Sequence, residues 1–500
     1  MNANGLDARL DPRTRALLDG APQRLVIDGR MVAALDGATR ELRYPATGAS
    51  FAHVCEGGVD DARAAVAAAR RAFDAGPWPR LSPAERSRVL ERLAGLMERD
   101  ARVLAELETL ETGKPIAESN GDVARAIDGV RFYSAAARLS RGETIPVTER
   151  LSVGTVREPL GVVAAIVPWN VPLVLCVSKS APALAAGNAV VAKPSEDTPL
   201  TALVLARLAL EAGLPEGVLN VVTGVGATVG RFLTESAEVD GVTFTGGTST
   251  GRGVAAAAAG SHKRVQVELG GKSPNVVFAD ADLDAAIRGA ASAIFYGQGE
   301  ICSAGSRLLV ERGVFDRVVD GVVARAKALR VGDPLDPATE MGALASHRHL
   351  AAVCAHVDRA VAEGARLGAG GGALAIPGFD GGAFMAPTVL VDVREGSAAE
   401  QEEIFGPVLV ALPFDHEAQA LRIANGTRYG LGAGVWTRDS ARARRMARGF
   451  RAGAVWINTF NLFDTSVPFG GVKASGGGSR EWSELALDSF TEVKSVWEAV

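Results

Sequence analysis

Apolar residues recur at helical spacing in the first hundred residues of the chain. Four of them, from Ala62 to Phe73, lie three or four positions apart on one face of a helix, and Gly76-Pro77 would end that helix. A second helix is predicted to open at Ser82-Pro83-Ala84-Glu85, a capping box with proline at the first helical position. The pattern predicts two helices before residue 100.

Downstream of residue 160, short apolar runs alternate with helical segments. This alternation is typical of βαβ units, in which helices cover both faces of a parallel sheet, so the predicted fold class is α/β. The strand-like runs are 162–167, 188–192, 218–222, 242–244, 275–278, 307–310, 408–412 and 454–457, and the helix-like segments are 199–211 and 228–234.

Segment 141–156 interrupts this series. Its apolar residues alternate with polar ones, as in Ile145-Pro146-Val147 and Leu151-Ser152-Val153. We interpret it as an antiparallel excursion with an exposed edge, and such an edge usually needs a partner.

The composition limits the class of protein. Of the 500 residues, 47% are apolar and 22% are charged, with 53 Lys+Arg against 58 Asp+Glu. This excludes a disordered or fibrous chain, and the length requires two or three domains. The net charge of −5, without a basic stripe, argues against a nucleic-acid partner.

Cysteine usage and hydropathy favour a cytoplasmic protein. The four cysteines are far apart and form no CxxC pair, as expected of free thiols in a reducing compartment. Residues 1–30 contain no apolar core of a secretory signal. Residues 159–178 are uncharged, but Pro168, Asn170 and Pro172 interrupt them, so we predict a buried strand and a turn, and no membrane partner.

Two glycine-rich turns follow predicted strands and precede predicted helices. Residues 224–230 have the spacing GxGxxxG, one residue longer than the usual dinucleotide fingerprint, and residues 244–251 form the second turn. Phosphates bind at such turns because helix N-termini present free N–H groups. A tight strand-to-helix turn without a ligand is the alternative.

Lys193-Pro194-Ser195-Glu196 follows another predicted strand. A carboxylate at the carboxyl end of a parallel strand commonly holds a ribose 2′-hydroxyl. Glu196 would also repel a 2′-phosphate, which favours NAD over NADP. A solvated surface turn is the alternative for Lys193 and Glu196.

Cys302 and Glu268 are the candidate reactive groups. Cys302 follows the glycine-rich approach Gln298-Gly299-Glu300-Ile301, which could leave its sulfur accessible, and Glu268 ends a short apolar run. A free thiol is mostly protonated at pH 7 and would need help from its site. An inert core cysteine and a structural carboxylate are the alternatives.

Seven motifs, spread over nearly the whole chain, support an interpretation of function. They are Pro168-Trp169-Asn170, Lys193-Pro194-Ser195-Glu196, Phe244-Thr245-Gly246, Glu268-Leu269-Gly270-Gly271-Lys272, Gln298-Gly299-x-x-Cys302, Glu403-Ile404-Phe405-Gly406-Pro407-Val408 and Pro468-Phe469-Gly470-Gly471-Val472-Lys473-x-Ser475-Gly476. In this order the set resembles the aldehyde dehydrogenase superfamily. The resemblance implies a Rossmann-like parallel-sheet cofactor domain, an α/β catalytic domain and a small antiparallel β oligomerisation element.

The resemblance also implies a mechanism. Cys302 matches the family's nucleophile, whose thiolate attacks the aldehyde carbon. The Asn170 side chain and the Cys302 N–H would hold the oxyanion, and losing such a donor costs roughly 10²–10³ in rate. Glu268 would activate the water that hydrolyses the thioester left after hydride transfer. Its presence weighs against the coenzyme-A-acylating branch, which usually lacks it.

The resemblance further implies a nicotinamide cofactor, with NAD expected and NADP less suited. No metal is expected, since the His347-x-His349 pair lacks a third ligand. The residues implied in cofactor binding are Ile166, Trp169, Lys193, Ser195, Glu196, Gly226, Gly230, Phe244, Thr245, Gly246, Gly247, Leu269, His349, Glu403 and Phe405.

Some positions depart from the family pattern. Gly247 replaces the usual serine that contacts phosphate. Glu300 is expected to point away from Cys302, because an inward carboxylate would raise the pKa of the thiol. Lys179 and Glu484 match a second proton path, although segment 475–481 carries one extra residue that affects the alignment.

By resemblance, residues 1–140 and 157–269 form the cofactor domain, 270–470 the catalytic domain, and 141–156 with 485–500 the oligomerisation element. That element would build a homodimer or homotetramer by sheet extension. The expected substrate is a small-molecule aldehyde. A semialdehyde or amino-aldehyde specialist, a coenzyme-A-dependent enzyme and a catalytically silent binding or structural member are the alternatives.

Overall fold

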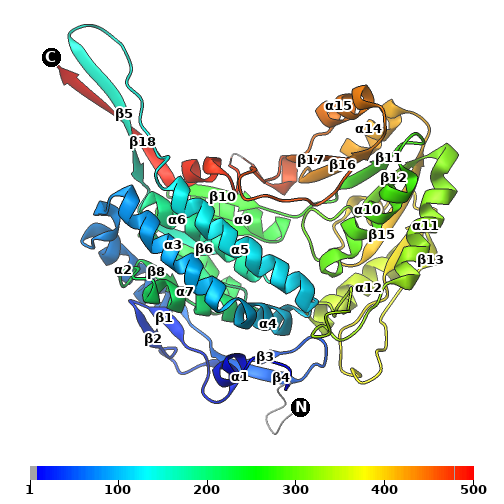
Figure 1. The fold of residues 1–500 in the computed structure, drawn as a ribbon, viewed down its shortest axis with the longest axis horizontal. Coiled ribbons are helices and arrows are strands. Elements are labelled where there is room, and N and C mark those ends of the chain that lie inside the picture. Colours follow the sequence, from blue (N-terminus) through cyan, green and yellow to red (C-terminus); the bar gives the residue numbers. More distant parts are fainter. Residues whose placement is uncertain (1–7, 478) are drawn as a thin grey trace.

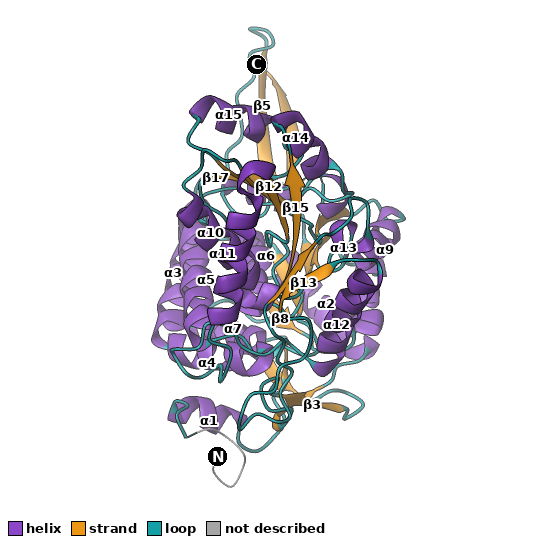
Figure 2. Cartoon of the chain, turned by 90° about the vertical axis from the view of Figure 1, so that its right-hand side faces the viewer, coloured by secondary structure: helices purple, strands orange, loops and turns teal. Residues whose placement is uncertain are grey.

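Two seven-stranded sheets form the body of the protein, and a two-stranded ribbon projects from it (Figure 1). The computed structural model describes residues 8–477 and 479–500, so the first residues of the predicted cofactor domain and one glycine of the 476–478 run lie outside the described residues. Seen from the side, the strands run through the middle with helices on both sides of them (Figure 2). The α/β fold class is confirmed.

The first sheet has the strand order β10-β9-β6-β7-β8-β1-β2. The strands from β10 to β8 are parallel, whereas β1 and β2 are antiparallel at one edge. Their bounds are β1 Leu25–Ile27, β2 Arg30–Val32, β6 Val162–Ile166, β7 Ala189–Lys193, β8 Leu219–Val221, β9 Gly241–Thr245 and β10 Arg264–Glu268.

Helices cover this sheet on two faces, each with its own apolar cluster. One cluster joins the sheet to α3 Pro83–Arg99, α4 Ala101–Thr112, α5 Ile116–Ala136, α6 Pro172–Ala186 and α7 Leu200–Glu211, and the other joins it to α2 Val59–Asp74 and α8 Arg231–Glu235. The predicted capping box opens α3, because the Ser82 hydroxyl accepts from the Glu85 N–H while Glu85 accepts from the Ser82 N–H. The remaining elements on this side are α1 Pro12–Leu18, the hairpin β3 Thr39–Arg43 with β4 Ser50–Cys55, and α9 Thr248–Ala259.

The second sheet has the order β13-β14-β15-β12-β11-β16-β17, and only β13 is antiparallel to its neighbour. Its strands are β11 Pro274–Val277, β12 Arg307–Glu311, β13 Arg366–Ala369, β14 Thr388–Val391, β15 Val408–Phe414, β16 Gly432–Trp436 and β17 Ala454–Ile457. Its helices are α10 Leu283–Phe295, α11 Phe315–Ala328, α12 His347–Ala362, α13 Ala398–Gln401, α14 Glu417–Asn425 and α15 Ser440–Gly449.

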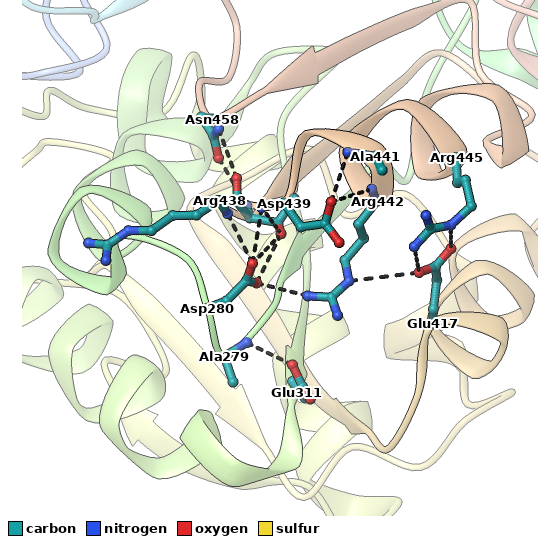
Figure 3. Close-up of polar contacts among 11 residues, drawn as sticks. Ala279, Asp280, Glu311, Glu417, Arg438, Asp439, Ala441, Arg442, Arg445 and Asn458 are labelled. Carbon is teal, nitrogen blue, oxygen red and sulfur yellow. Dashed lines mark hydrogen bonds and ion pairs between the residues drawn. The ribbon is translucent and has the colours of Figure 1, made fainter.

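A carboxylate network joins the segments that follow β11, β16 and β17 in the second sheet (Figure 3). Asp280, just after β11, accepts hydrogen bonds from the Thr437 hydroxyl and from the backbone N–H groups of residues 438 and 439. It also forms an ion pair with Arg442, 2.9 Å away. Thr437 in turn exchanges two hydrogen bonds with Asn458, where the segment after β17 begins. The network thus fixes the start of segment 458–469, which runs to the candidate site.

The predicted antiparallel excursion is present as the projecting ribbon. Strand β5 Leu151–Pro159 pairs with β18 Thr491–Ala499 along its full length. Residues Glu484–Phe490 form a 3₁₀ segment, so within the expected element 485–500 the strand starts only at Thr491. Val493 and Trp497 on β18 are 59% and 61% exposed, so the ribbon offers apolar side chains to its surroundings.

In the described part of the chain, none of the helices has both the length and the apolar character that a membrane crossing requires.

Candidate active site

Four neighbouring strands of the first sheet end in predicted site residues. Ile166 ends β6, Lys193 ends β7, Thr245 ends β9 and Glu268 ends β10. Because these strands are adjacent and parallel, their carboxyl ends meet at one edge of the sheet, where open α/β sheets bind ligands.

The first glycine-rich turn lies against two of these strand ends. A Cβ placed on Gly226 or Gly230 would come within 3.9 Å of the Lys193 side chain, and one on Gly230 would also reach Ile166. The longer glycine spacing has a structural cause, because residues Gly226–Gly230 form one turn of π-helix before α8. The glycines leave room between the turn and Lys193, as a bound dinucleotide would require.

Glu196 is held as a charged group beside this turn. Its carboxylate lies 3.4 Å from the Lys193 ammonium. Burial would raise the pKa of Glu196, but the Lys193 charge and hydrogen bonding outweigh it and lower that pKa. Ser195, also predicted, is buried and its hydroxyl accepts from the Asp197 N–H at 3.4 Å.

The second glycine-rich turn connects the cofactor side to Glu268. The Gly246 N–H donates to the Glu268 carbonyl at 3.1 Å, and the Phe244 ring packs against Gly246. Gly247 caps the N-terminus of α9, and a Cβ added there would meet nothing within 4 Å. A serine would therefore fit at Gly247, and its replacement by glycine leaves the helix N-terminus open. Leu269 packs under the same helix, against Gly251.

Three predicted cofactor residues from distant segments form one aromatic cluster. The ring centroids of Trp169 and Phe405 are 5.4 Å apart, and those of Trp169 and His349 are 5.1 Å apart. His349 Nε2 lies 2.7 Å from the Phe405 carbonyl oxygen, and the Nε2 of His347 lies against another carbonyl, that of Gly381. The described residues include no group of three or more potential metal ligands.

Glu403, between α13 and β15, contacts the segment that connects β10 to β11. Its Oε1 accepts from the Gly271 N–H at 2.9 Å, and a Cβ at Gly270 would collide with its carboxylate. Burial raises the pKa of Glu403 to about 7. Gly270 is therefore required for Glu403 to approach, whereas a Cβ at Gly271 would collide with the Cys302 carbonyl.

The three predicted catalytic residues lie around the approach to Cys302. Asn170 is buried, and its Nδ2 donates to the Glu300 carbonyl at 2.7 Å. Glu268 Oε2 accepts from the Gly471 N–H at 3.1 Å, while its buried Oε1 has no hydrogen-bond partner among the described residues. Burial raises the pKa of the Cys302 thiol to about 12, and the charges of Glu403 and Glu268 add to the effect.

Glu300 points away from the nucleophile, as expected. Its carboxylate accepts from the Ala345 N–H at 3.0 Å and lies 3.5 Å from His349 Nε2. The charges that raise the pKa of Cys302 come from other carboxylates.

Comparisons with known proteins agree with this geometry. The model of the aldehyde dehydrogenase family matches residues 32–496. The NADP/NAD-dependent aldehyde dehydrogenase PuuC of Escherichia coli is 47% identical over 97% of both chains, and the betaine aldehyde dehydrogenase of Bacillus subtilis is 43% identical over 95% of this chain and 97% of its own.

The chain belongs to the aldehyde dehydrogenase family. Among solved structures, the NAD⁺ complex of a Bacillus cereus aldehyde dehydrogenase superposes with a TM-score of 0.96 at 42% identity, covering 98% of this chain and 99% of that one. An NAD⁺ complex of an indole-3-acetaldehyde dehydrogenase gives 0.94 at 45% identity, covering 98% of each. Family membership makes the protein an oxidoreductase of aldehydes that uses a nicotinamide cofactor.

Lys179 contacts a different glutamate from the one predicted to share a second proton path with it. Lys179 forms a buried ion pair with Glu481, not with Glu484. Glu481 is 2% exposed and also reaches the Thr245 hydroxyl, whereas Glu484 opens the 3₁₀ segment before β18. The prediction selected Glu484 by its position along the chain alone, and the fold brings Glu481 to Lys179 instead. The signal available in the sequence was Glu481 itself, a second glutamate three positions before Glu484 and next to Arg480.

Proposed function

We propose that this chain oxidises an aldehyde to a carboxylic acid with NAD, through a thioester on Cys302 that Glu268-activated water hydrolyses. The observation that carries the proposal is the state of Glu268. It is a buried carboxylate with one oxygen that has no hydrogen-bond partner among the described residues, and its charge acts on the Cys302 thiol. Such a group can hold a water molecule and take its proton.

The chain's own residues have distinct tasks in this scheme. Cys302 attacks the aldehyde carbon and carries first a thiohemiacetal and then a thioester. Asn170 offers its side-chain amide to the oxyanion, together with the Cys302 N–H. When bound, NAD supplies a positively charged ring that favours a thiolate nearby, and it accepts the hydride. Glu268 then removes a proton from the hydrolytic water, and the acid leaves.

The raised pKa of Glu268 suits a general base that must also release its proton. Burial is the first cause, and the Glu481 charge is the second. A carboxylate with an ordinary pKa would be a much weaker base. Lys179 and Glu481 form a buried ion pair whose charges both act on Glu268, and this pair would offer the proton a route away from it.

Cofactor residues fit a dinucleotide with a free 2′-hydroxyl. Lys193 and Glu196 would hold the adenosine ribose, and the charge kept on Glu196 by Lys193 would repel a 2′-phosphate. The turns at Gly226 and Gly246 would receive the pyrophosphate, and Glu403 and the aromatic cluster would contact the nicotinamide side.

Other features of the proposal concern the whole protein. Residues 1–140 and 157–269 would form the cofactor domain, residues 270–470 the catalytic domain, and segments 141–156 and 485–500 the element that builds a homodimer or homotetramer. The exposed apolar residues of the β5–β18 ribbon support this role. The cytoplasmic location stays a prediction.

The test is NADH formation at 340 nm with short, long, aromatic, semialdehyde and amino-aldehyde substrates, each with NAD and with NADP. We expect turnover with NAD for at least one aldehyde without added coenzyme A. Cys302→Ala should abolish it, while Cys354→Ala, which removes another partly exposed thiol, should leave it unchanged. NAD binding without turnover of any aldehyde would contradict the proposal, and a requirement for coenzyme A would indicate the acylating alternative.

A further inference from the structure

We propose that Glu118 is a positioning residue for the nucleophile, because its carboxylate holds the turn before Cys302 through the backbone N–H of Gly297. The inference rests on the proposed function and adds to it a residue from outside the predicted site. Glu118 lies in the first turn of α5, and no motif singled it out.

The contact joins two elements that are far apart in sequence. Both carboxylate oxygens of Glu118 accept from the Gly297 N–H, at 3.2 and 3.0 Å. Gly297 lies two residues after the end of α10 and directly before the approach to Cys302. Burial raises the pKa of Glu118 to about 8, so the hold depends on the reach of the side chain and its acceptor oxygens rather than on a full charge. A buried hydrogen bond to a backbone N–H that has no other acceptor is costly to lose, so it can fix the position of the turn.

The turn needs such an external hold. Gly297, Gln298 and Gly299 have φ values of +58°, +54° and +70°, three consecutive residues in the left-handed region. A non-glycine residue such as Gln298 is strained in this region, because its Cβ crowds the backbone. Strained conformations persist only where surrounding contacts impose them, and the Gln298 side chain adds one by donating to the Ala343 carbonyl at 3.3 Å.

A chain of hydrogen bonds leads from this turn to the oxyanion site. The Gly297 carbonyl accepts from the Glu300 N–H at 2.8 Å. The Glu300 carbonyl accepts from Asn170 Nδ2 at 2.7 Å, and Cys302 follows two residues later. A displacement of Gly297 would therefore reach both Asn170 and Cys302, and a shift of about 1 Å at reacting groups can cost about 10² in rate.

The surroundings of Glu118 provide an anchor on one side and a cavity on the other. Lys114, just before α5, lies buried between Glu108 at 3.0 Å and Asp122 at 2.7 Å, and this pairing fixes the start of the helix. Between α10 and α11 is a cavity of about 530 Å³ that Glu118 and Tyr296 border. If Glu118 were shortened, the Gly297 N–H would face this space.

The experiment compares three substitutions that separate reach from charge. Glu118→Gln keeps the length and an acceptor oxygen, Glu118→Asp keeps the charge but retracts it, and Glu118→Ala removes both. Hydrolysis of p-nitrophenyl acetate without cofactor needs Cys302, Asn170 and Glu268 but no hydride transfer, and kcat with the best aldehyde and the Kd of NAD are measured beside it. We expect Gln to stay within about threefold of the wild type, and Asp and Ala to lose about tenfold or more in both rates at unchanged NAD affinity.

A matched control is Glu106→Ala on α4. Glu106 also accepts a backbone N–H, that of Asp11, and contacts the Thr14 hydroxyl, but it has no link to the turn before Cys302. It should keep ester hydrolysis within about twofold.

Three results would overturn the inference. In the first, Glu118→Asp keeps full activity while Glu118→Gln loses it. In the second, all three Glu118 variants hydrolyse the ester at the wild-type rate. In the third, Glu106→Ala loses as much activity as the Glu118 variants. If instead the ester hydrolysis rates of the wild type and its variants follow the expected order but the wild type oxidises no aldehyde, the proposed function fails and the role of Glu118 stands.

Discussion

Two groups of carboxylates in this aldehyde dehydrogenase have opposite properties. Asp280, just after β11 in the second sheet, accepts several hydrogen bonds and forms an ion pair with Arg442. These contacts outweigh its partial burial and lower its pKa (Figure 3). Around Cys302, burial raises the pKa of Glu268 and of Glu403, and Glu268 keeps an oxygen without a partner among the described residues.

The difference shows how one residue type serves two purposes. A fully hydrogen-bonded carboxylate holds its charge and ties segments together. A buried and incompletely bonded one has a raised pKa and binds a proton more readily, and such groups concentrate where catalysis occurs. The comparison leads to four tests, from the largest expected effect to the smallest.

Glu268→Gln should reduce steady-state NADH formation by about 10²–10⁴, because the water that hydrolyses the thioester would lose its base. Hydride transfer precedes that step, so stopped-flow measurement at 340 nm should still show a burst of up to one NADH per active site. Absence of both burst and turnover would place Glu268 before hydride transfer.

Glu481→Gln should move the acid limb of the kcat profile to lower pH by about one unit or less. The Glu481 charge is the second cause of the raised pKa of Glu268, so its removal lowers that pKa and ionises the base at lower pH. Glu484→Gln is the matched control and should leave the profile unchanged. A shift in the control alone would restore Glu484 to the proton path.

Asp280→Asn should destabilise the protein by about 1 kcal/mol, a modest value because the side chain is 36% exposed and water screens its ion pair. Because the folded pKa is lowered, the wild-type advantage is full above the unfolded pKa of about 3.9 and is lost as the pH falls through the folded value. Denaturant unfolding at neutral and acid pH measures it, and the pH profile of kcat should not change.

Glu196→Gln should have the smallest effect, a rise of about threefold in KM for NAD and a relative gain for NADP. Glu196 combines features of both groups, since it is partly buried but kept charged by Lys193. Initial rates with each cofactor measure the ratio, and Asp197→Asn on the neighbouring residue is the control. An unchanged ratio would remove Glu196 from cofactor discrimination.

The strand and helix pattern predicted most of the first sheet, because buried parallel strands are continuous apolar runs. The predicted strand 162–167 corresponds to β6 and the predicted helix 199–211 to α7, each with one residue fewer. The antiparallel edge strands β1 and β2 were not predicted, since three-residue strands leave little periodic signal.

By itself, the sequence determined the fold class, the family and the three residues proposed for catalysis, because these are written in local motifs and in apolar periodicity. Tertiary structure alone decided that Glu481 rather than Glu484 pairs with Lys179, and that Glu118 reaches Gly297 from 179 positions away. Such pairings, like the raised pKa of the Cys302 thiol, depend on burial and on contacts between distant segments. Local sequence contains no direct record of either.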